Sequence, residues 1–336
     1  MAGSDISFAL EDVIASGPLA SKLGLSRDKV TSNLAWWKEM GDVLCAHLQM
    51  DPKDLTDAAK RRIYNYYLPV YYWVEKTLKT HKGATKDAAP LVIGISAPQG
   101  CGKTTLVTSL EVLTKHQGIN AATVSIDDFY LTYEDQTALA AANSDNGLLQ
   151  YRGNAGSHDL KLGTKTLEEL TALRDPGATA AVPRYDKSAY QGRGDRAPVS
   201  DWPRVEGPLD LVLFEGWMSG FAPLAPAEAA AVEPQLAPVN AALGEYKEAW
   251  DRFCDAWLVV QVEDYNWVQK WRLQAEVAMR EKGLPCMTDA QVQDFVDRFL
   301  PAYKAYLPGL YRDGPTTSAG KPYLGIQVDA NRNVRG

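Results

Sequence analysis

Residues 1–85 carry apolar side chains at the spacing of helical turns, which predicts a helical N-terminal subdomain. Pro69 falls inside the second apolar run and predicts a kink or break there. The tyrosines around Trp73 are not interleaved with Arg and Lys, which favours a helix packed against the next domain over base stacking. The two runs are Val30, Leu34, Trp37, Met40, Leu44 and Leu48, then Ile63, Tyr67, Val70 and Val74.

Residues 86–336 show a different pattern, in which short apolar runs alternate with helical ones after a polar linker at residues 81–89. This alternation predicts an α/β fold, with a mostly parallel sheet flanked by helices. The predicted strands are Leu91–Ser96, Ala121–Ile126, Leu209–Phe214, Trp257–Val262 and Tyr323–Val328. The predicted helices are Thr104–Lys115, Thr166–Leu173, Tyr265–Lys282 and Asp289–Tyr306.

Two of these helices begin with the spacing of a capping box, at Thr166 with Glu169 and at Thr288 with Gln291. Two long stretches without a regular pattern, 131–208 and 221–240, predict insertions in the sheet. The first is rich in charge and glycine, which favours a functional loop. The second is rich in Ala and Pro, which favours a surface insertion.

The composition of the 336 residues, 46% hydrophobic and 23% charged, is that of a soluble globular chain. A net charge of −7 argues against a general nucleic-acid or membrane-surface binder, and no apolar run approaches the roughly 20 residues of a membrane helix. We therefore expect no nucleic-acid or membrane partner. The cysteines are far apart and form no CxxC pair, which argues against zinc and a disulfide framework and fits a reducing compartment. They are Cys45, Cys101, Cys254 and Cys286.

The first residues, Met1 to Ile6, have neither the basic and apolar pattern of a signal peptide nor the Arg- and Ser-rich character of a transit peptide. Two interpretations remain open. Either the protein is made where it works, or a targeting segment has been removed from this form.

The most specific chemical signal is the segment 91–106, which runs from an apolar strand through a glycine loop into a helix. A nucleoside triphosphate needs this order of elements. Gly100 and Gly102 have no Cβ, so backbone N–H groups can curl around a phosphate. Ala97 stands where the usual motif has glycine and is small enough to keep the turn.

The helix after this loop begins near Lys103 and points its positive end at the bound anion. Lys103 is predicted to reach the β- and γ-phosphates, and the Thr104 hydroxyl to coordinate Mg²⁺. Both the helix terminus and Lys103 are expected to lower the pKa of Cys101, although a small loop filler remains the favoured interpretation of this thiol. The predicted ATP-binding residues are Gln99, Gly100, Cys101, Gly102, Lys103, Thr104 and Thr105.

Acidic residues occur at the ends of two predicted strands. Asp127 is predicted to accept a proton from a substrate hydroxyl or to hold a water on Mg²⁺, and its neighbour Asp128 to have a supporting or capping role. Glu215 ends an apolar strand in the manner of a Walker B element, whose carboxylate orients Mg²⁺. With Thr104, these two acids form the predicted metal site. Which acid is the general base stays open.

Two glycine-rich loops supply cations for a substrate carboxylate, which the planar fork of Arg suits. A solvated loop is the alternative interpretation of these residues. The predicted substrate-binding residues are Arg152, His158, Arg184 and Lys187, with Arg193 and Arg196 nearby. Arg272 lies on a later helix that is predicted to act as a catalytic lid, although its spacing from Glu276 fits a surface ion pair equally well.

Several blocks in this order resemble the plant-type D-glycerate 3-kinases, in the uridine kinase and phosphoribulokinase branch of P-loop kinases. The resemblance covers the chain from Leu91 to its C-terminus, and the N-terminal helices are also similar. The blocks are Ser96-Ala-Pro-Gln-Gly-Cys-Gly-Lys-Thr-Thr, Ser125-Ile-Asp-Asp-Phe-Tyr, Arg152-Gly-Asn-Ala-Gly-Ser-His-Asp, Pro183-Arg-Tyr-Asp-Lys-Ser, Leu213-Phe-Glu-Gly-Trp-Met and Trp271-Arg-Leu-Gln-Ala-Glu.

The resemblance implies a P-loop kinase that uses ATP and Mg²⁺ to phosphorylate the 3-hydroxyl of D-glycerate. It also implies a monomer with a photorespiratory role in the chloroplast stroma. Enzymes of the family are made with a transit peptide, so this chain would correspond to the mature form or a trimmed one.

Two alternatives remain open from the sequence. A related kinase acting on a nucleoside, pantothenate or a sugar phosphate would share every ATP-side feature. A regulatory ATP-binding module would also share the phosphate loop, whereas a GTPase is disfavoured because no Asn-Lys-x-Asp motif follows a strand.

Overall fold

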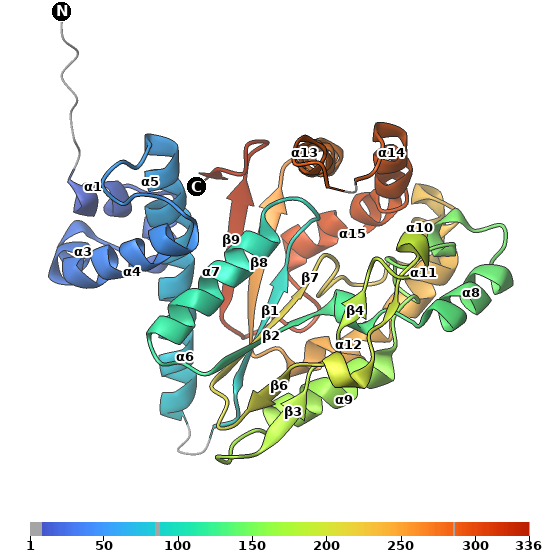
Figure 1. The fold of residues 1–336 in the computed structure, drawn as a ribbon, viewed down its shortest axis with the longest axis horizontal. Coiled ribbons are helices and arrows are strands. Elements are labelled where there is room, and N and C mark those ends of the chain that lie inside the picture. Colours follow the sequence, from blue (N-terminus) through green and yellow to red (C-terminus); the bar gives the residue numbers. More distant parts are fainter. Residues whose placement is uncertain (1–8, 85–87, 285, 336) are drawn as a thin grey trace, which may run out of the picture.

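The computed structural model describes residues 9–84, 88–284 and 286–335, so the sequence features at residues 1–6 and part of the predicted linker lie outside it. Within these ranges a six-stranded sheet with the order β10-β9-β8-β1-β7-β2 forms the middle of the molecule (Figure 1). All strands from β9 to β2 run parallel, and β10 pairs antiparallel at one edge. The predicted α/β fold is therefore confirmed. The strands are β1 Leu91–Ser96, β2 Ala121–Ser125, β7 Leu211–Gly216, β8 Ala256–Val262, β9 Tyr323–Val328 and β10 Val334–Arg335.

The register of the sheet brings three strand ends together. Strand β1 is buried along its whole length, as expected for a parallel strand covered on both faces. Ser96 of β1 lies opposite Gly216 of β7, and Ser125 of β2 lies opposite Glu215. The segments that leave these strands consequently start side by side at the carboxyl edge of the sheet, where ligands bind in open α/β folds.

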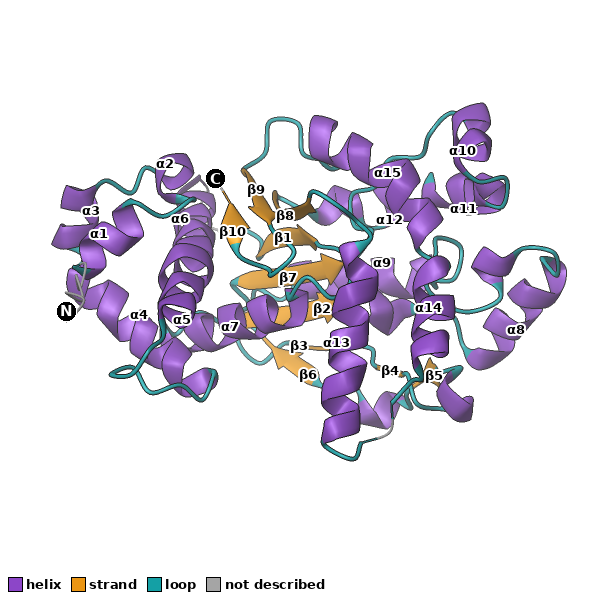
Figure 2. Ribbon diagram, turned by 90° about the horizontal axis from the view of Figure 1, so that it is seen from above, coloured by secondary structure: helices purple, strands orange, loops and turns teal. Residues whose placement is uncertain are grey.

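Helices occupy the described part of residues 1–85, as predicted, and lie at the left of Figures 1 and 2. They pack on α7 (Lys103–His116), where the Tyr71 hydroxyl donates to the carbonyl of Leu113 at 3.3 Å. Their apolar side chains belong to the same buried core as the sheet, so a domain boundary near residue 85 stays a prediction. These helices are α1 Leu10–Ala15, α2 Ala20–Leu23, α3 Arg27–Ser32, α4 Leu34–His47, α5 Asp57–Arg62 and α6 Leu68–Ala84.

The interruption predicted at Pro69 takes the form of a π-helical turn, Ile63–Tyr67, directly before α6. In a regular α-helix the proline ring collides with the carbonyl four residues earlier, here that of Asn65, and proline has no N–H to donate. A π-helical turn widens the backbone at this point. The chain therefore stays helical from Asp57 to Ala84.

Further helices surround the sheet. The prediction of one continuous helix over Asp289–Tyr306 is wrong. This segment is two helices, because Pro301 lies in the first turn of the second, where a missing N–H costs least. No helix in the described ranges is long and apolar enough to cross a membrane. The remaining α-helices are α8 Tyr133–Ala142, α9 Leu160–Thr171, α10 Pro226–Val232, α11 Leu236–Leu243, α12 Tyr246–Ala249, α13 Trp267–Glu281, α14 Asp289–Asp297 and α15 Leu300–Asp313.

One of the two predicted capping boxes is present. Thr288 accepts the backbone N–H of Gln291, whose side chain accepts the N–H of Thr288 in return. Thr166 is not a cap, because it lies in the interior of α9. That helix begins earlier than predicted, since the carboxylate of Asp159 accepts a backbone N–H of its first turn.

Both predicted insertions contain regular structure, so their description as irregular is wrong. Residues 131–208 contain α8, α9 and two small two-stranded sheets, and residues 221–240 contain α10 and most of α11. Ala229 and Leu236 of the second insertion are fully buried, so its helices contribute to the core. The two sheets are antiparallel and pair β3 (Thr179–Ala181) with β6 (Arg204–Glu206), and β4 (Tyr185–Asp186) with β5 (Asp195–Arg196). Short 3₁₀ turns lie at Ile126–Phe129, Gly147–Leu149, Tyr190–Gly192, Val199–Asp201 and Asp251–Phe253.

The buried carboxylate of Asp251 connects three segments near the core. It accepts the backbone N–H of Gly220 at 3.3 Å and the hydroxyl of Thr316 at 2.6 Å. Burial raises the pKa of Asp251 to about 7, against the opposing effects of these hydrogen bonds and of the Lys321 charge. The folded protein therefore binds this proton more readily than the unfolded chain does between about pH 4 and pH 7.

We predict that the Asp251→Asn variant loses this pH dependence of stability. Because the native state holds the extra proton, the wild-type free energy of unfolding falls as the pH rises through this window, and an amide cannot ionise. The free energy of unfolding of the variant, relative to that of wild type, should rise by on the order of 1–3 kcal/mol between about pH 4 and pH 8. Urea unfolding of both proteins across this range measures the difference. A difference that does not change with pH would contradict the prediction.

Candidate active site

The phosphate loop connects β1 to α7 and has a backbone that only glycine adopts easily. Gly100 and Gly102 have φ of +76° and +96°, and Gly102 caps the helix. A Cβ on Gly100 would lie 2.7 Å from the Cβ of Trp271, so the loop is also packed tightly against α13. The predicted strand, loop and helix are therefore all present.

The first turn of α7 presents backbone N–H donors at this loop. The first i→i−4 bond of the helix runs from the N–H of Leu106 to the carbonyl of Gly102 at 3.0 Å. The N–H groups of Lys103, Thr104 and Thr105 precede this ladder and point out of the helix terminus. Thr104 and Thr105 are exposed, so their hydroxyls face solvent at the positive end of the dipole.

Lys103 and Glu215 form an ion pair beside the loop. Glu215 lies inside β7 rather than after it, because the strand extends to Gly216. Burial lowers the pKa of Lys103, but the charges of Glu215 and Asp127 outweigh it and raise the pKa above its ordinary value. Lys103 is therefore a stable cation at the end of the sheet.

Asp127 lies in the 3₁₀ turn after β2, close to this pair. Its Oδ1 accepts the hydroxyl of Tyr130 at 2.9 Å, and its Oδ2 accepts the ammonium of Lys187 at 2.6 Å. Burial raises the pKa of Asp127, but Lys187, Lys103 and the hydrogen bonds outweigh it and hold the pKa at about 2. The carboxylate is thus ionised, and both of its oxygens have a partner.

Asp128 points to a different group, as the sequence predicted. It forms an ion pair with Arg184 at 3.2 Å. Burial raises the pKa of this carboxyl group, and the charge of Arg184 lowers it less. Arg184 is therefore positioned beside the Asp127 turn, although its contact with a substrate stays a prediction.

The Arg152 side chain binds the backbone of a neighbouring loop. Its guanidinium donates to the carbonyls of Gly192 at 2.9 Å, Lys187 at 3.3 Å, and Arg193. In this position Arg152 fixes the segment that carries Lys187. The direct contact with a substrate carboxylate that the sequence predicts for Arg152 is not tested by this geometry.

His158 lies behind Tyr130. Its ring stacks on the Tyr130 ring with centroids 4.6 Å apart, and its Nδ1 lies 2.8 Å from the Tyr246 hydroxyl. Burial lowers the pKa of His158 to about 3, against a smaller opposing effect of Asp127. The imidazole is neutral and supports Tyr130, which in turn holds Asp127; its predicted substrate contact stays a prediction.

Arg272 is engaged within its own helix. It pairs with Glu276 at 2.7 Å, and Glu276 is 1% exposed and also accepts the backbone N–H of Met287. Helix α13 nevertheless covers the phosphate loop, since Trp271 lies against Gly100. The structure therefore contains the helix at the predicted place, and the role of Arg272 as a lid residue stays a prediction.

Known proteins with a similar sequence and fold identify the family. The chain is 51% identical over 327 residues to the chloroplastic D-glycerate 3-kinase of Arabidopsis thaliana, covering 96% of this chain and 72% of that one. It is 37% identical to the probable ATP-dependent kinase TDA10 of Saccharomyces cerevisiae, over 74% of this chain and 88% of that protein. The structure of D-glycerate 3-kinase from Cryptococcus neoformans matches with a TM-score of 0.73 at 34% identity, covering 80% of this chain and 97% of that one. The chain belongs to the D-glycerate 3-kinase family. A comparison with models of protein families found no match.

Sequence reasoning missed one contact of the phosphate loop in this D-glycerate 3-kinase family member. Arg332, in the turn between β9 and β10, donates to the carbonyl of Gly100 at 2.7 Å and to the side chain of Gln274 at 3.1 Å. It also lies 5.1 Å from the ring of Trp271. The C-terminal turn therefore braces the loop and α13 together. No local motif marks Arg332, because its partners are far away in the sequence.

The expectation that Cys101 has a lowered pKa is wrong. Burial raises the pKa of this thiol to about 11, and Lys103 and the backbone N–H groups only partly oppose this effect. The side chain is 1% exposed, so desolvation of the thiolate outweighs the positive helix terminus. Cys101 is thus a small apolar filler under the loop, the interpretation favoured from the sequence.

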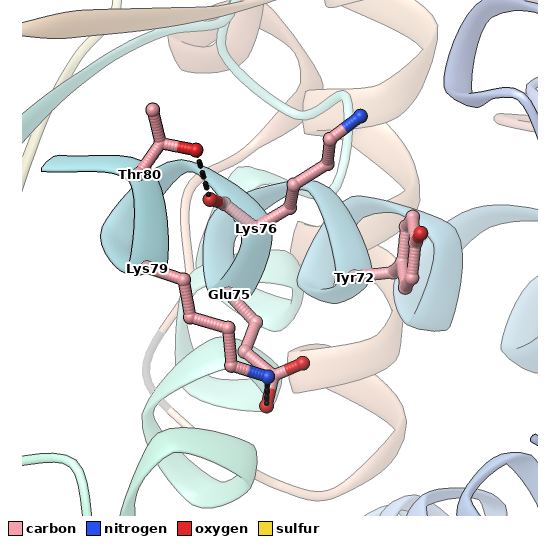
Figure 3. Close-up of a pocket in the computed structure, with 5 residues that line it drawn as sticks. All are labelled: Tyr72, Glu75, Lys76, Lys79 and Thr80. Carbon is pink, nitrogen blue, oxygen red and sulfur yellow. Dashed lines mark hydrogen bonds and ion pairs between the residues drawn. The ribbon is translucent and has the colours of Figure 1, made fainter. Parts of the chain in front are cut away.

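One surface hollow of the described chain lies away from these residues. It is on α6 and is lined by Tyr72, Glu75, Lys76, Lys79 and Thr80, where Lys79 and Glu75 form an ion pair at 3.1 Å (Figure 3). No residue of the phosphate loop or of the acids around it lines this hollow. The site of this family member is therefore defined by its charged side chains and loops.

We predict that Gly100→Ala lowers nucleotide affinity. The added Cβ would meet Trp271, and alanine at this positive φ costs about 1–3 kcal/mol of strain, so affinity for ADP should fall about tenfold or more. Gly177→Ala is the matched control, because Gly177 has φ +82° and no atom within 4 Å of an added Cβ. Calorimetric titration with ADP should show the loss in the first variant alone. Equal affinities in the two variants would contradict it.

Proposed function

We propose that this protein transfers the γ-phosphoryl group of ATP to the 3-hydroxyl of D-glycerate, giving 3-phospho-D-glycerate and ADP. The observation that carries the proposal is the meeting of Lys103, Glu215, Asp127 and Lys187 beside the phosphate loop. The relationship to D-glycerate 3-kinases supports the choice of acceptor.

The loop and the acids fit ATP with Mg²⁺. The turn is open at Gly102, where an added Cβ would have only the Arg332 side chain within 4 Å, at 3.9 Å, and the N–H groups at the start of α7 suit a phosphate. The Thr104 hydroxyl and the carboxylates of Asp127 and Glu215 are hard oxygen donors, the type that Mg²⁺ prefers alongside phosphates and water. When bound there, Mg²⁺ would neutralise charge on the phosphates. In the described residues, no group of three or more His, Cys, Asp or Glu side chains would hold a metal on its own.

The chemistry needs a base and a cation for the transferred group. Asp127 accepts the hydroxyl proton while the substrate oxygen bonds to the γ-phosphorus and the bond to the β–γ bridging oxygen breaks, with ADP keeping the electron pair. Lys103 stabilises the charge on the transferred group. We favour Asp127 over Glu215 as the base because the lysine that pairs with Asp127 is 57% exposed, against 16% for the lysine that pairs with Glu215. The side chain of Asp127 is also the more exposed of the two acids, 29% against 13%.

Cations beside Asp127 suit the carboxylate of glycerate. Arg184 and Lys187 lie next to the Asp127–Asp128 turn through their ion pairs, whereas Arg152 supports the Lys187 loop through backbone carbonyls. A substrate carboxylate can take the place of Asp127 or Asp128 as the partner of these cations. We assign Arg184 and Lys187 to the carboxylate, and Arg272 to the lid over the phosphates.

The cellular setting follows from the same relationship. We infer a monomer in the chloroplast stroma with a role in photorespiration, supported by the identity to the chloroplastic enzyme of Arabidopsis. Fractionation of the source cell, followed by immunodetection with the stroma as the expected compartment, tests the location.

The substrate assignment is tested by a panel of acceptors. ADP formation is measured with D-glycerate, a nucleoside, pantothenate and a sugar phosphate, and the phosphorylated product is identified by mass spectrometry. We expect turnover with D-glycerate. Turnover of another acceptor in its place would assign a related kinase, and ATP binding without any phosphorylated product would favour a regulatory module.

The choice of base predicts different effects for two isosteric variants. Asp127→Asn should lower kcat about 10²–10⁴-fold, since the amide cannot accept the proton. Glu215→Gln should mainly raise the Mg²⁺ concentration needed for half-maximal rate, because it weakens the charge around Lys103 and the metal. Steady-state rates across a Mg²⁺ series measure both effects. A large kcat loss only in Glu215→Gln would make Glu215 the base.

A further inference from the structure

Each oxygen of Asp127 already accepts a hydrogen bond in this structure, which makes the carboxylate a weaker acceptor for a substrate proton. Oδ1 accepts the hydroxyl of Tyr130 at 2.9 Å, and Oδ2 accepts the ammonium of Lys187 at 2.6 Å. Tyr130 is 4% exposed and fixed by its stacking on His158, so its hydrogen bond is a permanent part of the turn. The Lys187 side chain is 57% exposed, so Oδ2 is the oxygen whose partner can leave.

Hydrogen bonds fix the backbone around Lys187, whereas the Lys187 side chain is exposed. Arg152 donates to the Lys187 carbonyl, and Ser188 donates both its N–H and its hydroxyl to Asp186, at 2.8 and 2.6 Å. The following Tyr190 and Gln191 have φ of +49° and +57°, in the left-handed region that such residues rarely adopt. A rigid loop thus presents a long, flexible cation directly over the base.

The other cations near the site are committed elsewhere. Arg184 pairs with Asp128 at 3.2 Å, and Arg196 pairs with Asp159 at 2.9 Å. The Arg152 guanidinium donates hydrogen bonds to three backbone carbonyls. Of these four, Lys187 is the one whose position determines whether Asp127 can accept a proton.

We propose that Lys187 makes turnover depend on the carboxylate of the substrate: it holds Asp127 until that carboxylate draws the ammonium away and frees Oδ2. This step rests on the proposed function. The exchange replaces one ammonium–carboxylate pair by another and leaves Asp127 without the cation on Oδ2, which makes its carboxylate a better proton acceptor. An acceptor without the acid offers no such pair, and Lys187 then stays on the base. The residue is a specificity determinant for acids over neutral alcohols.

The test compares D-glycerate with glycerol, which has the same hydroxymethyl group and a neutral group in place of the carboxylate. In Lys187→Met the stem is retained without the charge, so Asp127 is free with either acceptor. We expect kcat/KM for D-glycerate to fall, while kcat/KM for glycerol stays constant or rises. The preference for glycerate should therefore drop about tenfold or more relative to wild type. The Lys187→Arg variant, which keeps the charge, should retain most of the preference for D-glycerate over glycerol.

Lys161→Met is the matched control, because Lys161 is an exposed lysine of α9 that has no place in the proposed machinery. This variant should leave kcat/KM unchanged for both D-glycerate and glycerol. If kcat/KM in Lys187→Met fell equally for D-glycerate and glycerol, the proposal would be overturned and Lys187 would be a structural residue. A wild-type protein that does not phosphorylate D-glycerate would instead overturn the proposed function, so the two failures are distinguishable.

Discussion

The parallel pairing of β1 with β7 and of β7 with β2 determines where every charged group of the site lies. Ser96, Gly216 and Ser125 stand at neighbouring strand ends, so the glycine loop, Glu215 and the Asp127 turn leave the sheet from one edge. A shift of one residue in the β7 register would turn Glu215 to the other face of the sheet. Strands β1 and β7 are almost entirely buried, and packing on both of their faces fixes this register.

Opposite charges at this edge are arranged in two pairs, Lys103 with Glu215 and Lys187 with Asp127. Partly buried charges of this kind are costly unless each has a partner, and removing one partner leaves the other uncompensated. A phosphate or carboxylate group that took one of these lysines would leave the paired acid without its cation. In the proposed reaction, that acid is then available to accept a proton or to hold Mg²⁺.

The sequence was sufficient for the nucleotide half of the site because its signals are local. A buried apolar strand, two glycines and Lys103–Thr104 are adjacent in the chain, and their order alone defines the loop and the helix start. Arg332 reaches the same loop from the C-terminal hairpin, and no local pattern marks it. The pKa of Cys101 was predicted wrongly for a related reason: its direction depends on burial by distant elements, which outweighs the local helix terminus.

The substrate half depends on contacts across the long insertion, which the sequence does not show, and the substrate contacts of its residues therefore stay predictions. A cationic loop suggests a carboxylate clamp, but it does not show that Arg152 turns back onto carbonyls or that His158 stacks beneath Tyr130. In this structure Arg152 contacts the loop of Lys187, and His158 stacks on Tyr130, the hydrogen-bond partner of Asp127. A charged residue type in a glycine-rich loop therefore predicts a region for substrate binding. The division between residues that touch the substrate and residues that hold them in place is decided by tertiary packing.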